Sequence, residues 1–235
     1  MPSSPKTLEE LLDEIERLIR EHQLEEASDI VEQILRFEPN NIELLNCKAG
    51  ILAEYGQYRE ALAVLEDIIS IDPMVAEIHA NRGKTLHHLE QYKAALASFD
   101  RALKLNATLA QAYTGKAGSL RMLNRLKEAI WCCEQALRFN ALDAQALYQK
   151  GKALQSLRRY AEAIEAFTQV MQLEPENAQV CYDQAWCYSV LQQHEKAIAA
   201  YDRAIQRAPT FAAAYHNKGL SLLMLNHVTD ALEAF

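Results

Sequence analysis

Apolar residues recur at helical spacing along almost the whole chain, in pairs of short segments separated by polar breaks. The stretch 144–177 shows the pattern: Leu147 and Leu154 mark the buried face of one segment, and Ile164 and Phe167 mark that of the next. Neither segment alternates with the period of two that a strand requires. The pattern therefore predicts two antiparallel helices joined by a tight turn, which we name helix A and helix B.

This pair of helices repeats with a fixed period. Pro39, Pro73, Pro175 and Pro209 are separated by 34, 102 and 34 residues, all multiples of 34. Self-similarity at such a period is the signature of a stacked-repeat architecture. If the proline slot is position 32, the repeats cover residues 8–41, 42–75, 76–109, 110–143, 144–177, 178–211 and, in part, 212–235.

Other positions keep the same register. Position 20 is alanine in every repeat, position 8 is glycine or alanine in all but the first, and position 24 is usually large. Gly56, Asn124 and Asn226 at position 15 predict a left-handed residue that ends helix A, and proline at position 32 predicts the end of helix B. We expect small residues at position 8 to pack closely against the alanine at position 20.

The two ends depart from the pattern. Thr7 and Glu10 form a capping box ahead of the first helix, so residues 1–7 are expected to be a disordered tail that ends at this cap. The first repeat is strongly acidic, which indicates a solvated cap or, alternatively, an acidic docking surface. The last repeat stops within helix B, and we expect Leu222, Leu225 and Phe235 to be poorly covered.

Composition narrows the class of protein. The net charge of −8 argues against a general nucleic-acid binder. The acidic residues are concentrated at the N-terminal end, because residues 1–75 carry 17 acidic and only 6 basic side chains. Five cysteines without a CxxC pair predict reduced thiols. The N-terminus has no apolar signal segment, and no apolar run reaches the roughly 20 residues that cross a bilayer. We therefore expect a cytoplasmic protein that binds no membrane.

The combined pattern over residues 8–235 resembles the tetratricopeptide repeat family: small at position 8, Leu or Tyr at 11, Ala at 20, a ring at 24 and Pro at 32. The resemblance implies an all-α, right-handed α-solenoid of about seven 34-residue helix-turn-helix repeats. It also implies a concave groove lined by helix A positions 2, 5, 6, 9, 12 and 13. Those positions give the candidate partner-binding residues Asn81, Lys84, His87, Gln111, Arg121, Gln145, Tyr148, Gln149, Lys152, Gln179, Tyr182, Asp183, Trp186, His216 and Asn217.

Two interpretations of the large groove residues stay open. Tyr148, Tyr182 and Trp186 are expected to form an aromatic patch that anchors a ligand beside Lys152, or else to fill the space between adjacent A helices. The glutamines at position 2 would bond the backbone of an extended ligand. Lys84, Arg121 and Lys152 indicate tolerance for an acidic partner.

Several sharper functions are not supported. Chaperone-binding members of this family clamp a terminal carboxylate with Lys at position 5 and Asn at position 9, and neither occurs here, so we expect no such binding. The string Gly83-Lys84-Thr85 lies within a predicted helix rather than a phosphate-binding loop. Neither a metal-ligand spacing nor a nucleophile–base pair can be assembled, so no catalytic residue, metal or cofactor is predicted.

The leading hypothesis is a protein-interaction scaffold or adaptor that binds an extended peptide or a helix of a partner protein in the groove. The alternative is the substrate-recruiting arm of a larger, transferase-like enzyme whose chain continues past Phe235. A third hypothesis is self-association through the uncapped C-terminal end.

Overall fold

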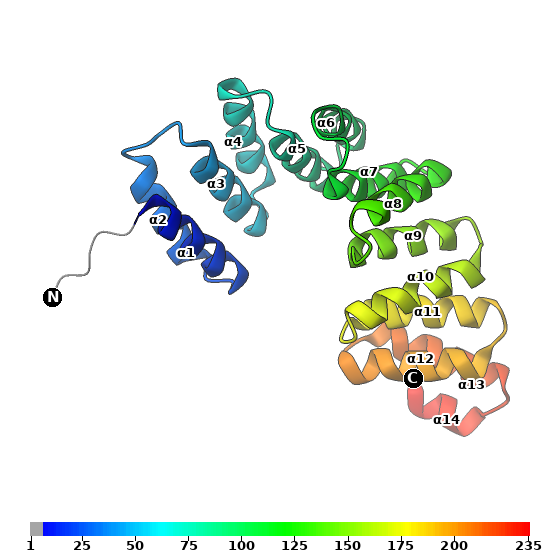
Figure 1. Ribbon diagram of the computed structural model, residues 1–235. Helices are drawn as coiled ribbons and strands as arrows, with labels where there is room; N and C mark the ends of the chain where they lie inside the picture. Colours follow the sequence, from blue (N-terminus) through cyan, green and yellow to red (C-terminus); the bar gives the residue numbers. More distant parts are fainter. Residues whose placement is uncertain (1–6) are drawn as a thin grey trace. The chain divides into compact units, whose positions relative to one another are not determined.

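The computed structural model describes residues 7–235, and every regular element in that range is an α-helix (Figure 1). The chain is an all-α helical-repeat solenoid, as predicted. Its helices are α1 (Leu8–Arg20), α2 (Leu24–Leu35), α3 (Ile42–Glu54), α4 (Tyr58–Ile71), α5 (Ala76–His88), α6 (Tyr92–Leu105), α7 (Ala110–Met122), α8 (Leu126–Phe139), α9 (Ala144–Ser156), α10 (Tyr160–Leu173), α11 (Ala178–Val190), α12 (His194–Arg207), α13 (Ala212–Met224) and α14 (Val228–Ala234).

The helix boundaries follow the 34-residue period. From the second repeat onward each helix A begins at the first residue of its repeat, and each helix B begins 16 residues later. The odd-numbered helices are therefore the A helices and the even-numbered ones the B helices.

The turn between the two helices is the same in every repeat. Position 15 has a positive φ throughout: His22, Gly56, Glu90, Asn124, Arg158, Gln192 and Asn226. The next backbone N–H bonds the carbonyl five residues earlier, as from Gln57 to Leu52 at 2.8 Å, which is the Schellman closure. The left-handed residue predicted from Gly56, Asn124 and Asn226 is confirmed, and four residues that do not favour this conformation adopt it as well.

From α4 to α12, helix B ends at one position of the repeat whether or not proline follows. α4 ends before Pro73, and α6 and α8 end at the equivalent residue although alanine holds the proline slot. In the latter two, Asn106 and Asn140 accept a bond from the backbone N–H two residues on, at 3.1 and 3.2 Å. Asp72 makes the same bond ahead of Pro73, to the Met74 N–H at 2.8 Å, so this side chain offers the backbone a turn in place of the helix with or without proline.

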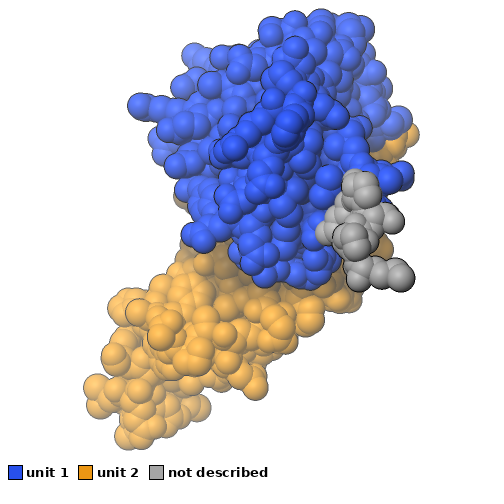
Figure 2. All heavy atoms as spheres, turned by 90° about the vertical axis from the view of Figure 1, so that its left-hand side faces the viewer, with its two compact units in different colours: residues 1–115 blue, residues 116–235 orange. Residues whose placement is uncertain are grey.

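The helices form two compact units, Met1–Gly115 and Lys116–Phe235 (Figure 2). In the N-terminal unit α1 through α6 each pack on the next, and in the C-terminal unit α8 through α14 do the same. The alanines at position 20 are buried in both, and the position 24 side chains Phe99, Phe167 and Tyr201 are among the largest fully buried residues.

The small residue at position 8 has a different neighbour from the one expected. A Cβ added to Gly83 would lie 2.8 Å from the ring of Phe99, and one added to Gly151 would lie 2.5 Å from that of Phe167. The space is thus needed for the ring at position 24 rather than for the alanine at position 20. Glycine occurs where that ring is phenylalanine, in repeats three, five and seven, and alanine occurs in repeats two, four and six.

An ion pair that the sequence reading missed links successive repeats. An acid at position 25 faces a base at position 7 of the next repeat, as in Glu66–Arg82 at 2.9 Å and Asp202–Lys218 at 2.7 Å. Glu134–Lys150 repeats the contact at 3.2 Å. Where both charges are missing, Gln184 Nε2 donates to Thr168 Oγ1 at 2.8 Å. The neutral pair keeps the geometry, so the contact aligns the helices.

The ends show one confirmation and one correction. Thr7 and Glu10 make both bonds of the capping box, so Thr7 is the N-cap of α1. The other residues of the expected tail lie outside the described residues. Leu222, expected to be poorly covered, is buried against Ala231 and Ala234 at 6% exposure, whereas Phe235 is 60% exposed as expected.

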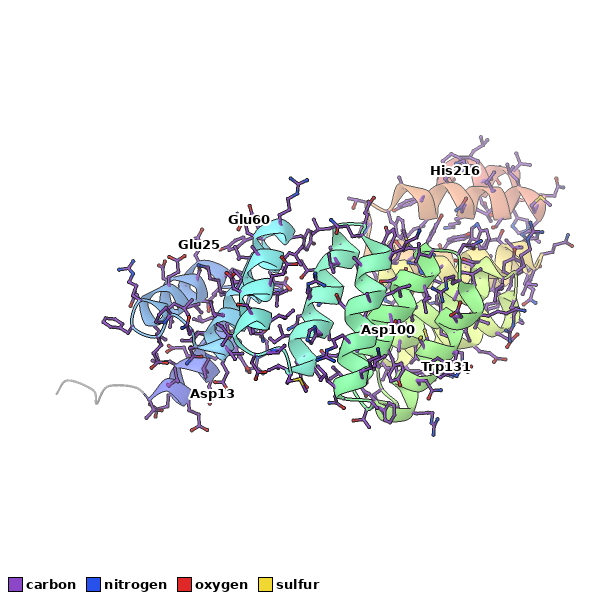
Figure 3. The ribbon with its side chains drawn as sticks, turned by 90° about the horizontal axis from the view of Figure 1, so that it is seen from above. Asp13, Glu25, Glu60, Asp100, Trp131 and His216 are labelled. Carbon is purple, nitrogen blue, oxygen red and sulfur yellow. The ribbon has the colours of Figure 1, made fainter. Side chains whose placement is uncertain are left out.

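The acidic side chains of the first repeats are solvated. Asp13, Glu25 and Glu60 are exposed and project from the N-terminal unit (Figure 3). This is the arrangement that a polar end cap requires. Glu14 stands at position 7 of the first repeat, the slot that holds a base in most later repeats.

Candidate functional site

The surface formed by the A helices carries an open pocket in the N-terminal unit. It lies between α3 and α5, has a volume of about 280 Å³, and is closed at one side by Tyr58 of α4. Gly50 forms part of its wall, and a Cβ added there would meet no atom within 4 Å. Gly50 at position 9 of the second repeat adds no side chain to this space, whereas Lys84, Lys152 and Trp186 occupy the same position in repeats three, five and six.

Polar groups line this pocket. Asn81 Nδ2 donates to Asn46 Oδ1 at 2.9 Å, which ties α5 to α3. The Thr85 hydroxyl donates to the Asn81 carbonyl at 3.0 Å. The ring of His88 stacks on that of Tyr58, with centroids 4.7 Å apart and an interplanar angle of 2°. These contacts fix the walls of the pocket, and Asn46, which accepts through its oxygen, keeps both amide N–H groups as donors.

Opposite charges stand in the same pocket. Lys84 and Glu54 both line it, both are exposed, and neither has an ion-pair partner among residues 7–235. Partial burial and the Lys84 ammonium lower the pKa of His88, and the Glu54 carboxylate opposes that effect. The lowered pKa favours the neutral form of His88, and Lys84 is the cation that lines the pocket.

In the C-terminal unit the equivalent surface is filled by a network around Asp183. This carboxylate, 3% exposed, accepts from Tyr148 Oη at 3.0 Å and from Lys152 Nζ at 2.8 Å. Burial and the Asp183 charge raise the pKa of Tyr148 well above its ordinary value. The contact neutralises Lys152, so this lysine offers little charge to a ligand.

The predicted aromatic residues pack in separate places. Tyr148 lies 6.1 Å from Phe167, and Tyr182 lies 4.9 Å from Phe211 between centroids. Tyr182 Oη also accepts from Asn217 Nδ2 at 2.8 Å. Trp186, on the same helix, meets the edge of the Tyr160 ring at 5.7 Å. The two tyrosines are thus partly used to join adjacent A helices, and Trp186 stays half-exposed.

One rule describes these contacts between repeats. Position 5 of one repeat bonds position 6 of the next in Asn46–Asn81, Tyr148–Asp183 and Tyr182–Asn217. Asp183 is buried in this contact, and Gln149 is buried as well, although both were predicted to face a ligand. Arg121 Nε donates to Gln149 Oε1 at 3.0 Å. Because this acceptor is neutral, the bond does not balance the positive charge of Arg121.

The remaining candidates are more open to solvent. Gln111, Gln145 and Gln179 at position 2 are exposed, as is His216, whose ring lies 5.6 Å from that of Phe235. His87 is half-buried against Tyr92, with ring centroids 5.3 Å apart. Sequence reasoning did not select Asn46, Gly50, Tyr58 or His88 as site residues, because a missing side chain and a ring stack give no signal in a list of polar groups.

Over the described range no group of three or more His, Cys, Asp or Glu side chains lies close enough to hold a metal ion. None of the helices described is long and apolar enough to cross a membrane. The five cysteines form no disulfide, and burial raises the pKa of Cys47 and of Cys187 to about 11.

Solved structures with the same fold come from several proteins. YrrB, described as a TPR protein with an unusual peptide-binding site, is 23% identical and matches over 80% of this chain and 97% of its own, with a TM-score of 0.61. PilF of Pseudomonas aeruginosa is 19% identical over 81% of this chain and 86% of its own, with a TM-score of 0.72. MamA of Desulfovibrio magneticus RS-1 is 22% identical over 72% and 96%, with a TM-score of 0.63. These likenesses show the fold.

Family models give a direct match in sequence. One tetratricopeptide repeat model matches residues 18–84 and 154–234, and a second matches residues 76–109. No curated protein matches the chain. The model matches cover more than half of the sequence and agree with the 34-residue helix pairs, so this chain belongs to the tetratricopeptide repeat family.

Proposed function

We propose that this chain is a protein-interaction scaffold or adaptor whose A-helix surface binds an extended peptide or a helix of a partner protein. The fold and the family support a protein-binding scaffold in general. The observation that carries the more specific proposal is the open, polar pocket between α3 and α5 on that surface. A pocket with a few polar groups on a rigid helical frame is the usual form of a ligand site.

The A helices of the C-terminal unit carry exposed polar side chains of their own. Gln145 and Gln179 lie at the start of α9 and α11, where an amide can donate to and accept from a peptide backbone. Trp186 adds a half-exposed ring on α11. YrrB, a protein of the same fold, is described as having a peptide-binding site, which makes a peptide the first ligand class to test.

The test compares two triple variants of the whole chain in affinity capture from the source cell. The surface variant is Lys84→Ala/Gln145→Ala/Gln179→Ala. The matched control, Lys93→Ala/Gln169→Ala/Gln206→Ala, removes the same three residue types from exposed positions on B helices. All six side chains are exposed, so both variants should keep the wild-type helicity.

We expect a partner that binds wild type and the control but is lost, or weakened at least tenfold, with the surface variant. Loss only with the B-helix control would overturn the proposal and move the site to the opposite face. The alternative of a substrate-recruiting arm uses the same surface, so the captured partner distinguishes the two: an enzyme's substrate supports the arm. We propose that the chain itself is not catalytic.

A further inference from the structure

The pocket between α3 and α5 combines features that select one chemical group. Its walls are small at Ala49, Gly50 and Ala53, and a Cβ added to Gly50 would meet no atom within 4 Å. An incoming side chain can therefore lie directly on the α3 backbone. The pocket volume of about 280 Å³ suits one long side chain with part of its backbone.

The pocket offers a ligand an ammonium group and an amide donor. Lys84 brings an ammonium group with no ion-pair partner in the described chain. Asn46 uses its oxygen to accept from Asn81, so its two amide N–H groups remain to donate. An ammonium beside an amide donor is the set that a carboxylate accepts best, because bonds to a charged group are the stronger ones.

We infer that this pocket seats a single acidic side chain of an extended peptide, with its carboxylate on Lys84 and Asn46. The inference rests on the proposed function and names the chemistry of the partner. Glu54 lines the same pocket and would repel a second carboxylate nearby. The surplus of acidic residues in repeats one and two also repels further acidic residues of the ligand. The partner segment thus carries one acid among neutral or basic residues, and not an acidic run.

Lys152, which holds the position of Lys84 in the fifth repeat, does not compete for this role. Lys152 is held by Asp183 at 2.8 Å, and that carboxylate also accepts from Tyr148. A ligand carboxylate there would meet a buried negative charge. Lys84 differs because no protein carboxylate is bound to its ammonium within the described residues.

The experiment measures binding of end-blocked nonapeptide libraries to the full chain. The libraries differ only at the central residue, which is Glu, Gln or Lys, and their flanks are randomised without Asp and Glu. End-blocking removes the terminal carboxylate, and one arm with a free C-terminus and a central Gln tests that source separately. Fluorescence anisotropy gives the affinity, and amide NMR shifts of residues 42–54 and 76–88 report the location.

We expect the Glu library to bind roughly threefold to tenfold more tightly than the Gln library. Lys84→Gln should remove this preference, Glu54→Gln should increase it, and Gly50→Leu should weaken all three libraries by filling the pocket. The matched control Lys93→Gln removes an exposed lysine of α6 outside the pocket and should leave the preference unchanged.

Equal binding of the Glu and Gln libraries, tighter binding of the Lys library, or binding only through a free C-terminus would overturn the inference. In each case the proposed function stands if A-helix amides still shift. A Glu preference that survives Lys84→Gln also overturns it. If no library moves any A-helix amide at millimolar peptide, the inference and the proposed function both fail.

Discussion

The pocket between α3 and α5 and the network between α9 and α11 occupy the same positions of the repeat. Position 5 holds Asn46 in the first and Tyr148 in the second, and each bonds position 6 of the following repeat. At position 9 the first has Gly50 and the second Lys152. One backbone arrangement thus gives an open pocket in one place and a closed polar contact in the other.

This comparison teaches where a repeat protein of this kind keeps room for a ligand. Tyr148 and Lys152 on α9 bond Asp183 of the next repeat and are not free for a ligand. Small side chains leave the space open, as Gly50 does. The richest-looking part of the surface in sequence is therefore the part most used for holding the repeats together.

Removing the Asp183 carboxylate at the centre of the network is expected to change the unfolding free energy most. Asp183→Ala leaves the Tyr148 hydroxyl and the Lys152 ammonium without their acceptor, and should cost about 2 to 3 kcal/mol of unfolding free energy. Lys84→Gln in the pocket should change it by less than about 0.5 kcal/mol, because Lys84 is exposed. Urea unfolding followed by circular dichroism measures both.

Asp183→Asn is the matched variant, since it keeps the shape and one acceptor oxygen. Its unfolding free energy should lie between those of wild type and Asp183→Ala. If all three proteins unfold at the same urea concentration, water replaces the carboxylate and the network does not stabilise the contact between α9 and α11.

Two glycine substitutions should have opposite signs. Gly151→Ala places a methyl group 2.5 Å from the buried Phe167 ring, and should destabilise by about 1 to 2 kcal/mol after the gain in helix propensity is subtracted. Gly50→Ala meets open space in a helix, and should stabilise by about 1 kcal/mol. Thermal and urea unfolding of the two variants give the signs. A loss of stability in Gly50→Ala would mean that the pocket closes in solution.

The sequence predicted the repeat architecture well because the signal occurs seven times. Position 20 is alanine in every repeat, and the 34-residue period places each helix start from α3 onward. The partner of the glycines at position 8 was wrong because periodicity tells which residues share a face and not which ring reaches it. Phe99 and Phe167 reach Gly83 and Gly151 across the hairpin.

The candidate site was predicted less well, for a physical reason. Residues such as Lys84 and Asn81 were selected by position, and they line the pocket. Asp183 holds the same position of its repeat as Asn81 and is nevertheless buried, because it accepts bonds from Tyr148 and Lys152 of the preceding repeat. Whether a polar side chain bonds the neighbouring repeat or faces solvent depends on the distances between helices, and these distances cannot be read from one sequence.

A smaller effect is expected from the hydroxyl that Tyr148 donates to Asp183. Tyr148→Phe should cost about 1 kcal/mol, compared with about 0.5 kcal/mol for Asn46→Ala, whose amide is more exposed to water. The first variant should also change the response to pH. Burial and Asp183 raise the pKa of Tyr148 in the folded chain, so the unfolded chain loses this proton first and stability falls as pH rises above about 10.

Urea unfolding at pH 9 and at higher pH separates the loss of the Tyr148 hydrogen bond from the pH dependence of the unfolding free energy. Tyr148→Phe should flatten the alkaline decrease, whereas Asn46→Ala should leave its slope unchanged. An unaltered slope in Tyr148→Phe would show that this phenol stays accessible to water in the folded chain.

The smallest effects are expected at the turns that end α3 and α9. Gly56 and Arg158 hold the same position, with φ of 74° and 61°. A residue with a Cβ is strained in this conformation, so Arg158→Gly should stabilise by about 0.5 to 1 kcal/mol and Gly56→Ala should destabilise by a similar amount. The two substitutions report on the backbone alone, since neither side chain enters the pocket or the network. Opposite and nearly equal shifts in the unfolding midpoint would show that the two regions share one backbone and differ only in the side chains placed on it. A destabilised Arg158→Gly would instead mean that the arginine contributes a contact that offsets the strain at this turn.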